Sequence, residues 1–113
     1  MTTTTSTITE IAPEEFKSRW SVPPIGITLL DVREAWEVAT AQVEGSFHLP
    51  MNQVPSRLAE LDPNAPVVVM CHGGMRSLQV AQYLADQGFA DVYNLSGGID
   101  AWSQEVDPTV PRY

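Results

Sequence analysis

A short apolar run that leads directly into a glycine-rich loop constrains this chain more than any other feature. Val67-Val68-Val69-Met70 is uninterrupted and mostly β-branched, which is typical of a strand buried on both faces of a parallel sheet. The loop Cys71-His72-Gly73-Gly74-Met75-Arg76-Ser77 follows at once. Apolar residues then recur at helical spacing, at Leu78, Ala81, Leu84 and Ala85, and Gly88 stands where a helix would end. The pattern predicts a central strand, a loop at its carboxyl end, and a helix.

The rest of the chain alternates between strand-like and helix-like segments. Short apolar runs predict strands at 7–11, 27–32, 46–49 and 91–95, and other segments predict helices at 13–20, 34–41, 54–61 and 99–105. Strands that alternate with helices form a parallel sheet covered on both faces. We therefore expect a single α/β domain over residues 7–113, with a mainly parallel sheet of about five strands and helices on both faces, preceded by a flexible polar tail at residues 1–6.

The acidic composition excludes several classes of function. The chain has 113 residues, which suits one domain, and a net charge of −8 with six basic side chains. A nucleic-acid-binding surface requires clustered basic residues, and these are scattered from Lys17 to Arg112, so we expect neither nucleic acid nor an anionic membrane as a partner. No segment has the pattern of a secretory signal or the roughly 18 apolar residues of a membrane helix, which predicts a cytoplasmic protein.

Cys71 is the only cysteine, so it is either an inert buried side chain or a reactive thiol. Its position favours a reactive thiol, because ligands of parallel α/β sheets bind at the carboxyl ends of strands. Gly73 and Gly74 allow the backbone to curl so that successive N–H groups face an anion, and the start of the next helix adds to this positive potential. We expect these groups, with Arg76, to lower the pKa of the thiol and so produce a nucleophilic thiolate.

Four motifs, in the same order, resemble those of the single-domain rhodaneses, or thiosulfate sulfurtransferases. They are Leu29–Glu34 (LLDVRE), Glu44–Pro50 (EGSFHLP), Val67–Ser77 (VVVMCHGGMRS) and Asn94–Trp102 (NLSGGIDAW). The resemblance spans nearly the whole chain and implies a rhodanese-like fold. One departure is Gln42, where the family usually has a histidine. Because that histidine is not the nucleophile, the expected chemistry is unaffected.

The resemblance implies a two-step transfer of sulfur through Cys71. The thiolate would take the outer sulfur of a small sulfur-containing anion such as thiosulfate and hold it as a persulfide. An acceptor, which is cyanide, a thiol or a protein, would then remove that sulfur. The loop amides would stabilise the charged sulfur, and the residues concerned are His72, Gly73, Gly74, Met75, Arg76 and Ser77. No external cofactor is implied, since the persulfide itself carries the sulfur.

Charged residues near the loop have more than one plausible role. Arg76 either binds the sulfonate of the donor or pairs with Asp31 or Glu37 and braces the loop. Asp31 and Arg33 follow the second predicted strand and therefore lie at the same edge of the sheet as Cys71. We expect them to support the loop from behind rather than to touch the substrate.

Histidine and tryptophan residues complete the set of candidates. His72 is expected to line the mouth of the site or to tune the acceptor, because a thiolate needs no general base. Trp36 is counted with Asp31 and Arg33 as a support of the site, where it would form a wall, and its alternative position is the core. Trp20 and Trp102 are assigned to packing. His48 is assigned a structural role, and its spacing from the other candidate ligands does not match a metal site, so no metal is expected.

Two alternative functions fit the same fold. The cell-cycle dual-specificity phosphatases and related arsenate reductases have a rhodanese-like fold with a Cys-x5-Arg loop, whereas this chain has four residues between Cys71 and Arg76. The shorter loop suits a single sulfur atom better than a tetrahedral phosphate. The other alternative is a non-catalytic rhodanese-like module that binds or regulates a partner. Such modules typically lose the cysteine, which this chain retains.

Overall fold

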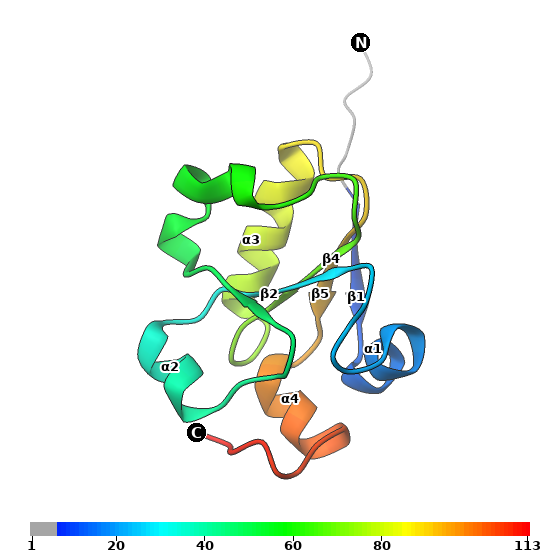
Figure 1. Ribbon diagram of the computed structural model, residues 1–113, viewed down its shortest axis with the longest axis vertical. Coiled ribbons are helices and arrows are strands. Elements are labelled where there is room, and N and C mark those ends of the chain that lie inside the picture. The colour runs from blue at the N-terminus through cyan, green and yellow to red at the C-terminus, as the bar shows by residue number, and fades with distance from the viewer. Residues whose placement is uncertain (1–6) are drawn as a thin grey trace.

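The computed structural model describes residues 7–113, which form one α/β domain (Figure 1). Its strands are β1 (Ile8–Ile11), β2 (Thr28–Asp31), β3 (Phe47–His48), β4 (Val67–Met70) and β5 (Val92–Leu95). Its α-helices are α1 (Pro13–Trp20), α2 (Ala35–Thr40), α3 (Met75–Asp86) and α4 (Gly98–Glu105). Each predicted strand is present, as are the helices predicted at 13–20, 34–41 and 99–105. The tail expected at residues 1–6 lies outside the described residues.

All five strands are parallel, and their order across the sheet is β1-β5-β4-β2-β3. β4 lies at the centre, and all four of its residues are buried. It pairs with β2, where Val69 lies opposite Leu30, and with β5, where Val67 lies opposite Val92. Because the strands are parallel, β2, β4 and β5 end at one edge of the sheet, and the loop after β4 starts there.

Successive residues of β4 face two different hydrophobic cores, one on each side of the sheet. Val67 and Val69 lie in the core that also contains the buried apolar residues of α3. Val68 and Met70 lie in the core that contains the buried apolar residues of α1 and α4. This alternation follows from the two-residue period of a strand. Trp102, assigned to packing from the sequence, lies in the second core.

The segment predicted as a helix at 54–61 forms two short 3-10 helices instead, η1 (Met51–Gln53) and η2 (Pro55–Glu60). The Val54 N–H donates to the Met51 carbonyl at 3.3 Å, a bond that spans three residues. Pro55 has no N–H with which to continue an α-helix from η1, and Arg57 has non-helical angles of φ −118° and ψ 19°. The apolar spacing of this segment favours a helix, but a continuous α-helix cannot pass through Pro55 and Arg57.

An irregular segment follows α4 and brings the C-terminus beside α2 (Figure 1). The Ser103 hydroxyl donates to the Val110 carbonyl at 2.7 Å. Arg112 forms an ion pair with Asp100 at 2.8 Å. These contacts fix the path of the segment, so that the side chain of Tyr113 reaches the region between α2 and the loop after β4.

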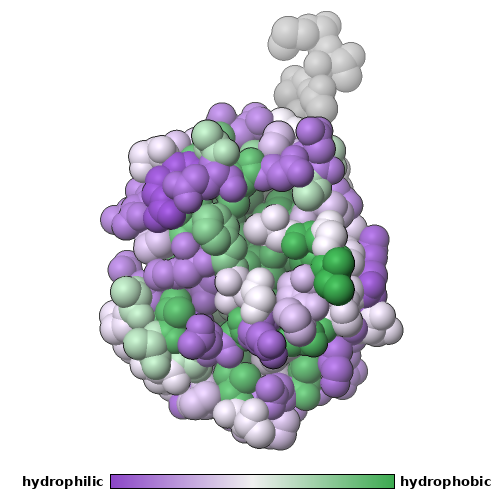
Figure 2. Space-filling model, viewed as in Figure 1, coloured by the Kyte–Doolittle hydropathy of each residue, from purple (hydrophilic) through white to green (hydrophobic). Residues whose placement is uncertain are grey.

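Hydrophobic residues at the surface are dispersed. On the face shown in Figure 2 they form small areas separated by hydrophilic residues. The large hydrophobic side chains that are most exposed are Ile25, Trp36 and Met75. Among residues 7–113, no helix combines the length and the apolar character needed to cross a membrane.

Candidate active site

Cys71 directly follows β4 and is buried, with 2% of the residue exposed. The backbone N–H of Gly74 donates to its Sγ at 3.1 Å, and the hydroxyl of Ser77 lies 3.3 Å from the same atom. Gly74 has a φ of 107°, in the left-handed region that glycine adopts without a steric penalty. This conformation turns the chain tightly enough for a loop donor and a donor from the first turn of α3 to converge on one sulfur.

Two opposing effects set the pKa of Cys71. Burial raises it, because a thiolate is poorly solvated in the protein interior. Hydrogen bonds from the Ser77 hydroxyl and from the N–H groups of Ser77, Gly74 and Gly73 lower it, and the net result is a lowered pKa. A lowered pKa increases the fraction of thiolate, which is the nucleophilic form, at neutral pH. Cys71 is therefore buried and yet surrounded by donors, an arrangement that an inert core thiol does not need.

The N-terminus of α4 holds the outer side of the loop. The N–H of Ile99 donates to the Cys71 carbonyl at 2.9 Å, and the N–H of Asp100 donates to the His72 carbonyl at 3.1 Å. Gly98 has a φ of 60°, and a Cβ at this position would collide with both of these carbonyl oxygens. These bonds hold the Cys71 and His72 carbonyls against α4. The N–H groups of the loop therefore remain available to the sulfur.

Arg76 forms a two-pronged ion pair with Glu37. Its Nη1 and Nη2 lie 2.7 and 2.8 Å from the two carboxylate oxygens, and the hydroxyl of Tyr113 donates to the same carboxylate at 2.7 Å. The hydrogen bonds from Arg76 are the main reason that the pKa of Glu37 falls to about 2. Of the two roles considered for Arg76, the structure shows the brace, and its partner is Glu37 rather than Asp31.

Asp31 is instead paired with Arg33, and both side chains are fully buried. Arg33 Nη2 and Nε lie 2.7 and 2.9 Å from the carboxylate oxygens of Asp31. Arg33 Nη1 donates to the Tyr113 hydroxyl at 3.0 Å and to the Glu37 carbonyl at 3.2 Å. Asp31, Arg33, Glu37, Arg76 and Tyr113 thus form one connected group, the ion-pair cluster. It links the end of β2 to α2 and to the loop.

A second connected group lies on the opposite side of the loop. Ser77 Oγ lies 2.6 Å from Asn94 Oδ1, and Asn94 Nδ2 donates to both carboxylate oxygens of Glu10, at 3.0 and 3.2 Å, and to the Gly74 carbonyl at 3.2 Å. We call Ser77, Asn94 and Glu10 the hydrogen-bond chain. Asn94 and Glu10 were not among the site residues predicted from the sequence. The available signal was Asn94 itself, because it is a polar residue in a predicted strand of otherwise apolar residues and belongs to one of the four motifs.

Three aromatic side chains lie in a row that begins in the loop itself, at His72. His72 stacks on Tyr113 with ring centres 4.3 Å apart, and Trp36 meets Tyr113 edge to face at 5.7 Å. We call Trp36, Tyr113 and His72 the aromatic row. Trp36 is 62% exposed, so of the two positions considered for it the structure shows the one beside the loop and not the one in the core. The only buried residue of α2 is Glu37, which leaves Trp36 at the surface.

His48 has a structural contact, since its Nε2 lies 2.7 Å from the Arg33 carbonyl. Within residues 7–113, no three histidine, cysteine, aspartate or glutamate side chains form a group that could hold a metal ion.

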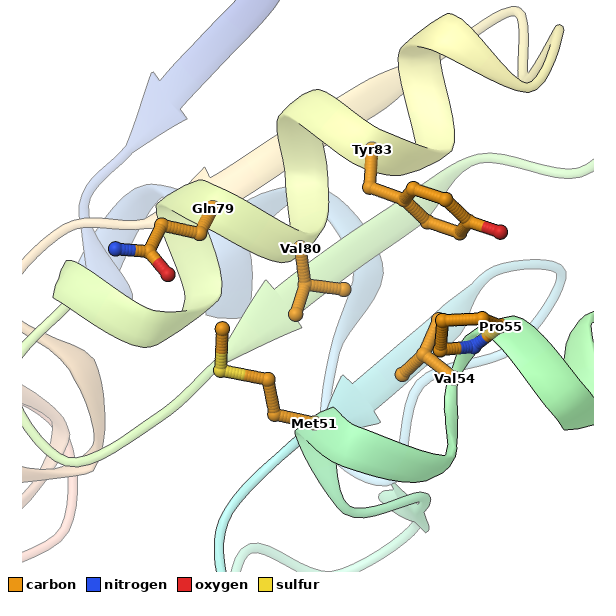
Figure 3. A pocket seen from close by; sticks show the side chains of 6 residues that line it. All are labelled: Met51, Val54, Pro55, Gln79, Val80 and Tyr83. Atoms are coloured by element: carbon orange, nitrogen blue, oxygen red, sulfur yellow. The ribbon is translucent and has the colours of Figure 1, made fainter.

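A separate apolar hollow of about 200 Å³ lies between α3 and the turns after β3 (Figure 3). Figure 3 shows the side chains that line it, which are Met51, Val54, Pro55, Gln79, Val80 and Tyr83. None of them is a thiol, a carboxylate or an amine, and Cys71 is not among them. The reactive groups are therefore those of the loop after β4.

Comparison with known proteins agrees with this geometry. The family model described as rhodanese-like domain matches residues 12–105. Thiosulfate sulfurtransferase GlpE of Actinobacillus pleuropneumoniae serotype 7 is 36% identical over 108 residues, which cover 95% of this chain and 97% of that protein. The rhodanese-like/PpiC domain-containing protein 12 of Arabidopsis thaliana chloroplasts is 38% identical over 94% of this chain, which spans only 38% of that protein.

Solved structures give the same result. A crystal structure of a rhodanese-like domain protein from Staphylococcus aureus aligns with a TM-score of 0.78 and 27% identity, over 94% of this chain and 99% of that one. This agreement in fold covers the five-stranded parallel sheet of this chain and the helices on both of its faces. This chain therefore belongs to the rhodanese family of sulfurtransferases.

Proposed function

We propose that this protein moves sulfane sulfur from thiosulfate or a similar small donor to a thiophilic acceptor through a persulfide on Cys71. The observation that carries the proposal is the convergence of the Gly74 N–H and the Ser77 hydroxyl on Sγ, at 3.1 and 3.3 Å. Such donors stabilise negative charge on sulfur, both in the thiolate and in the persulfide that follows. The name of the GlpE relative, thiosulfate sulfurtransferase, supports the same donor class.

In the first half-reaction the Cys71 thiolate attacks the outer sulfur of the donor. With thiosulfate, the S–S bond of the donor breaks, its electron pair leaves with sulfite, and Cys71 keeps the transferred sulfur as a persulfide. The total charge is unchanged, because a thiolate and a thiosulfate dianion become a persulfide anion and a sulfite dianion. The N–H groups of the loop from His72 to Ser77 would hold the charged outer sulfur.

In the second half-reaction an acceptor attacks that outer sulfur. The acceptor is cyanide in an assay and a thiol or a protein in the cell. The new S–S bond breaks and its electron pair returns to Cys71, which regenerates the thiolate. The step needs no external cofactor, because the sulfur moves from one nucleophile to another. A free thiolate requires a reducing compartment, for which we propose the cytoplasm.

Residues around Cys71 divide into those that touch the reacting atoms and those that position others. Cys71 is the catalytic residue, and the loop amides bind the persulfide. Asp31 and Arg33 act as positioning residues, since their hydrogen bonds connect them to the loop through Glu37, Tyr113 and Arg76. The partners proposed are a small sulfur-containing anion and a sulfur acceptor, with neither nucleic acid nor membrane involved.

The proposal can be tested by intact-protein mass spectrometry after incubation with thiosulfate. The wild type should gain the mass of one sulfur atom, and cyanide should remove it and form thiocyanate. Cys71→Ser removes the nucleophile at nearly constant volume, so this variant should fold but gain no mass. If it retains more than a trace of turnover, or if the wild type gains no sulfur, Cys71 is not the carrier.

A further inference from the structure

Positive charge near Cys71 is already bound to protein carboxylates. Arg76, the basic residue of the loop, has both carboxylate oxygens of Glu37 within 2.8 Å, and Arg33 is sealed in its pair with Asp31. Arg112, whose partner Asp100 adjoins His72, is paired as well. The basic residues of α1, Lys17 and Arg19, lie on a different element, where Arg19 stacks on Trp20 and Tyr93. None of these contacts leaves a guanidinium directed at a sulfur-donating substrate.

Negative charge, in contrast, is present at the loop, where Glu10 forms no ion pair with any basic residue of the described range 7–113. Glu10 accepts hydrogen bonds from Asn94 and Ser96, which are neutral donors. It lies one side chain away from Ser77, which in turn contacts Cys71 Sγ. The protein as a whole carries a net charge of −8. An incoming anion therefore meets repulsion that grows with its own charge.

The exposed side chains in and beside the loop are aromatic and apolar instead. The aromatic row, Trp36, Tyr113 and His72, borders the loop on the side of α2, and Trp36 is 62% exposed. Met75 follows Gly74 directly and is 76% exposed. Flat rings and a thioether offer favourable contacts to a hydrocarbon or aromatic group, and they offer little to an inorganic oxyanion.

From these two features, and given the function proposed above, we propose that the site prefers an organic sulfane-sulfur donor over inorganic thiosulfate. The preferred donor carries its transferable sulfur on an apolar body and has at most one negative charge, as organic thiosulfonates and persulfides do. For a thiosulfonate the step is balanced in the same way as for thiosulfate. The Cys71 thiolate bonds to the outer sulfur, the S–S bond of the donor breaks, and the sulfinate leaves with its electron pair.

Three donors separate the effect of charge from that of the apolar body. Thiosulfate is a dianion, methanethiosulfonate is a small monoanion, and benzenethiosulfonate is an aromatic monoanion with the same type of S–S bond. For each, kcat/KM is measured and divided by the rate constant of the same donor with a small free thiol, which removes intrinsic reactivity. We expect benzenethiosulfonate to exceed methanethiosulfonate by about tenfold and thiosulfate by more, a factor of ten being about 1.4 kcal/mol.

Variants of the rim identify the source of the preference. Trp36→Ala should lower the ratio of benzenethiosulfonate to methanethiosulfonate at least about threefold, because it removes the exposed ring of the aromatic row. Trp36→Arg should raise the relative rate with thiosulfate by supplying a cation. Ile25→Ala is the matched control, since Ile25 is 81% exposed but precedes β2 and so lies at the opposite edge of the sheet. It should leave the ratio unchanged.

The outcomes distinguish this inference from the function on which it rests. If thiosulfate reacts as well as benzenethiosulfonate after correction, or if Trp36→Ala and Ile25→Ala behave alike, the donor preference is wrong while the sulfurtransferase function stands. If none of the three donors loads sulfur onto Cys71, the proposed function is wrong and the donor preference falls with it.

Discussion

The ion-pair cluster and the hydrogen-bond chain flank the same loop, but they use charge differently. In the ion-pair cluster, Arg33 is matched by Asp31, and Arg76 is matched by Glu37. In the hydrogen-bond chain, the group that adjoins Cys71 Sγ is the neutral hydroxyl of Ser77. The comparison indicates that the ion-pair cluster fixes the shape of the loop, whereas neutral N–H and O–H dipoles supply the potential at the sulfur.

This division explains how a protein with a net charge of −8 can stabilise an anionic sulfur. Dipoles held at hydrogen-bond distance act strongly on the atom they touch and add no net charge to the surface. The Gly74 N–H at 3.1 Å is such a dipole, and its direction depends on the bonds between the loop carbonyls and α4. The distant carboxylates act only weakly on the sulfur, because dissolved ions at physiological salt screen exposed charges over a length of about 8 Å.

Gly98→Ala should have the largest effect, because it displaces the backbone of the loop that the ion-pair cluster and the hydrogen-bond chain both contact. The new Cβ would collide with the carbonyl oxygens of Cys71 and His72, at a residue whose φ is already 60°. We expect about 3 kcal/mol loss of stability, of which 1–2 kcal/mol is left-handed strain, and at least about tenfold lower sulfur transfer. Chemical denaturation and a sulfur-transfer assay measure the two effects.

Gly88→Ala is the matched control for that change. Gly88 has a φ of 94°, but a Cβ added there would have no atom within 4 Å. The variant should therefore lose only about 1–2 kcal/mol of stability from strain and keep its activity. Equal losses of activity in the two variants would contradict the role assigned to α4.

Glu37→Gln tests the ion-pair cluster through pH. The pKa of Glu37 is lowered to about 2, chiefly by Arg76. A lowered pKa means that the carboxylate stabilises the fold above its unfolded pKa of about 4.3, and that this contribution is lost as pH falls towards 2. This shift of the Glu37 pKa corresponds to at most roughly 3 kcal/mol of stability. At neutral pH we expect the variant to be about 2 kcal/mol less stable than the wild type, because Arg76 is partly exposed and solvent weakens the ion pair. The difference should shrink steadily in denaturation curves recorded at lower pH.

Glu60→Gln provides the comparison, because Glu60 also pairs with an arginine at 2.7 Å, but at the surface. This variant should differ much less from the wild type at every pH. A difference for Glu37→Gln that stays constant down to acidic pH would show that its effect does not come from the carboxylate charge.

A glycine inserted between Gly74 and Met75 sharpens the comparison by lengthening the loop without altering either group. The N–H groups stabilise the outer sulfur only while they converge on it at hydrogen-bond distance. We expect sulfur transfer to fall by at least about tenfold, or roughly 1.4 kcal/mol of transition-state stabilisation. The wild type should not hydrolyse an aryl phosphate appreciably, since its loop has only four residues between Cys71 and Arg76.

A glycine inserted after Gly26, in the turn before β2, serves as the control and should leave sulfur transfer unchanged. If the loop insertion transfers sulfur from thiosulfate as well as the wild type, or if the wild type hydrolyses phosphate esters efficiently, loop length does not determine the reaction. The phosphatase alternative would then have to be reconsidered.

Much of the fold could be predicted because its signals are local. The uninterrupted run of β4, the helical spacing in α3 and the regular alternation of segments each depend on neighbouring residues, and all of them were interpreted correctly. The error at 54–61 was local as well, since Pro55 and Arg57 interrupt a segment whose apolar spacing alone favours a helix. The placement of Cys71 at the carboxyl end of a central strand followed from topology rather than from any single residue.

Contacts between distant segments could not be predicted in the same way. Glu37 and Arg76 are separated by 39 positions, and Tyr113 meets Glu37 across 76, so their pairing depends on where α2 and the C-terminal segment lie. The sequence left two partners open for Arg76 for this reason. Two positions stayed open for Trp36 because hydrophobicity favours burial, whereas the single buried position of the short helix α2 is occupied by a charged residue.

Ser77→Ala should have the smallest effect and the most specific one, because it removes a neutral donor at Cys71 Sγ and leaves the ion-pair cluster intact. In the wild type, alkylation of Cys71 should show an inflection below about 8.5, the value of a free cysteine. Ser77 Oγ is 3.3 Å from Sγ and its single proton is shared with Asn94 Oδ1 at 2.6 Å, so its loss should raise the pKa of Cys71 while the N–H groups of the loop keep it below that of a free cysteine. Ser103→Ala, which removes a buried hydroxyl bonded to the Val110 carbonyl, should not move the inflection. The comparison between the two sides predicts the opposite pattern for Glu37→Gln, with a loss of stability and little change in the pKa of Cys71. If Glu37→Gln shifts the alkylation profile more than Ser77→Ala does, the guanidinium of Arg76 and not the neutral dipoles controls the thiolate.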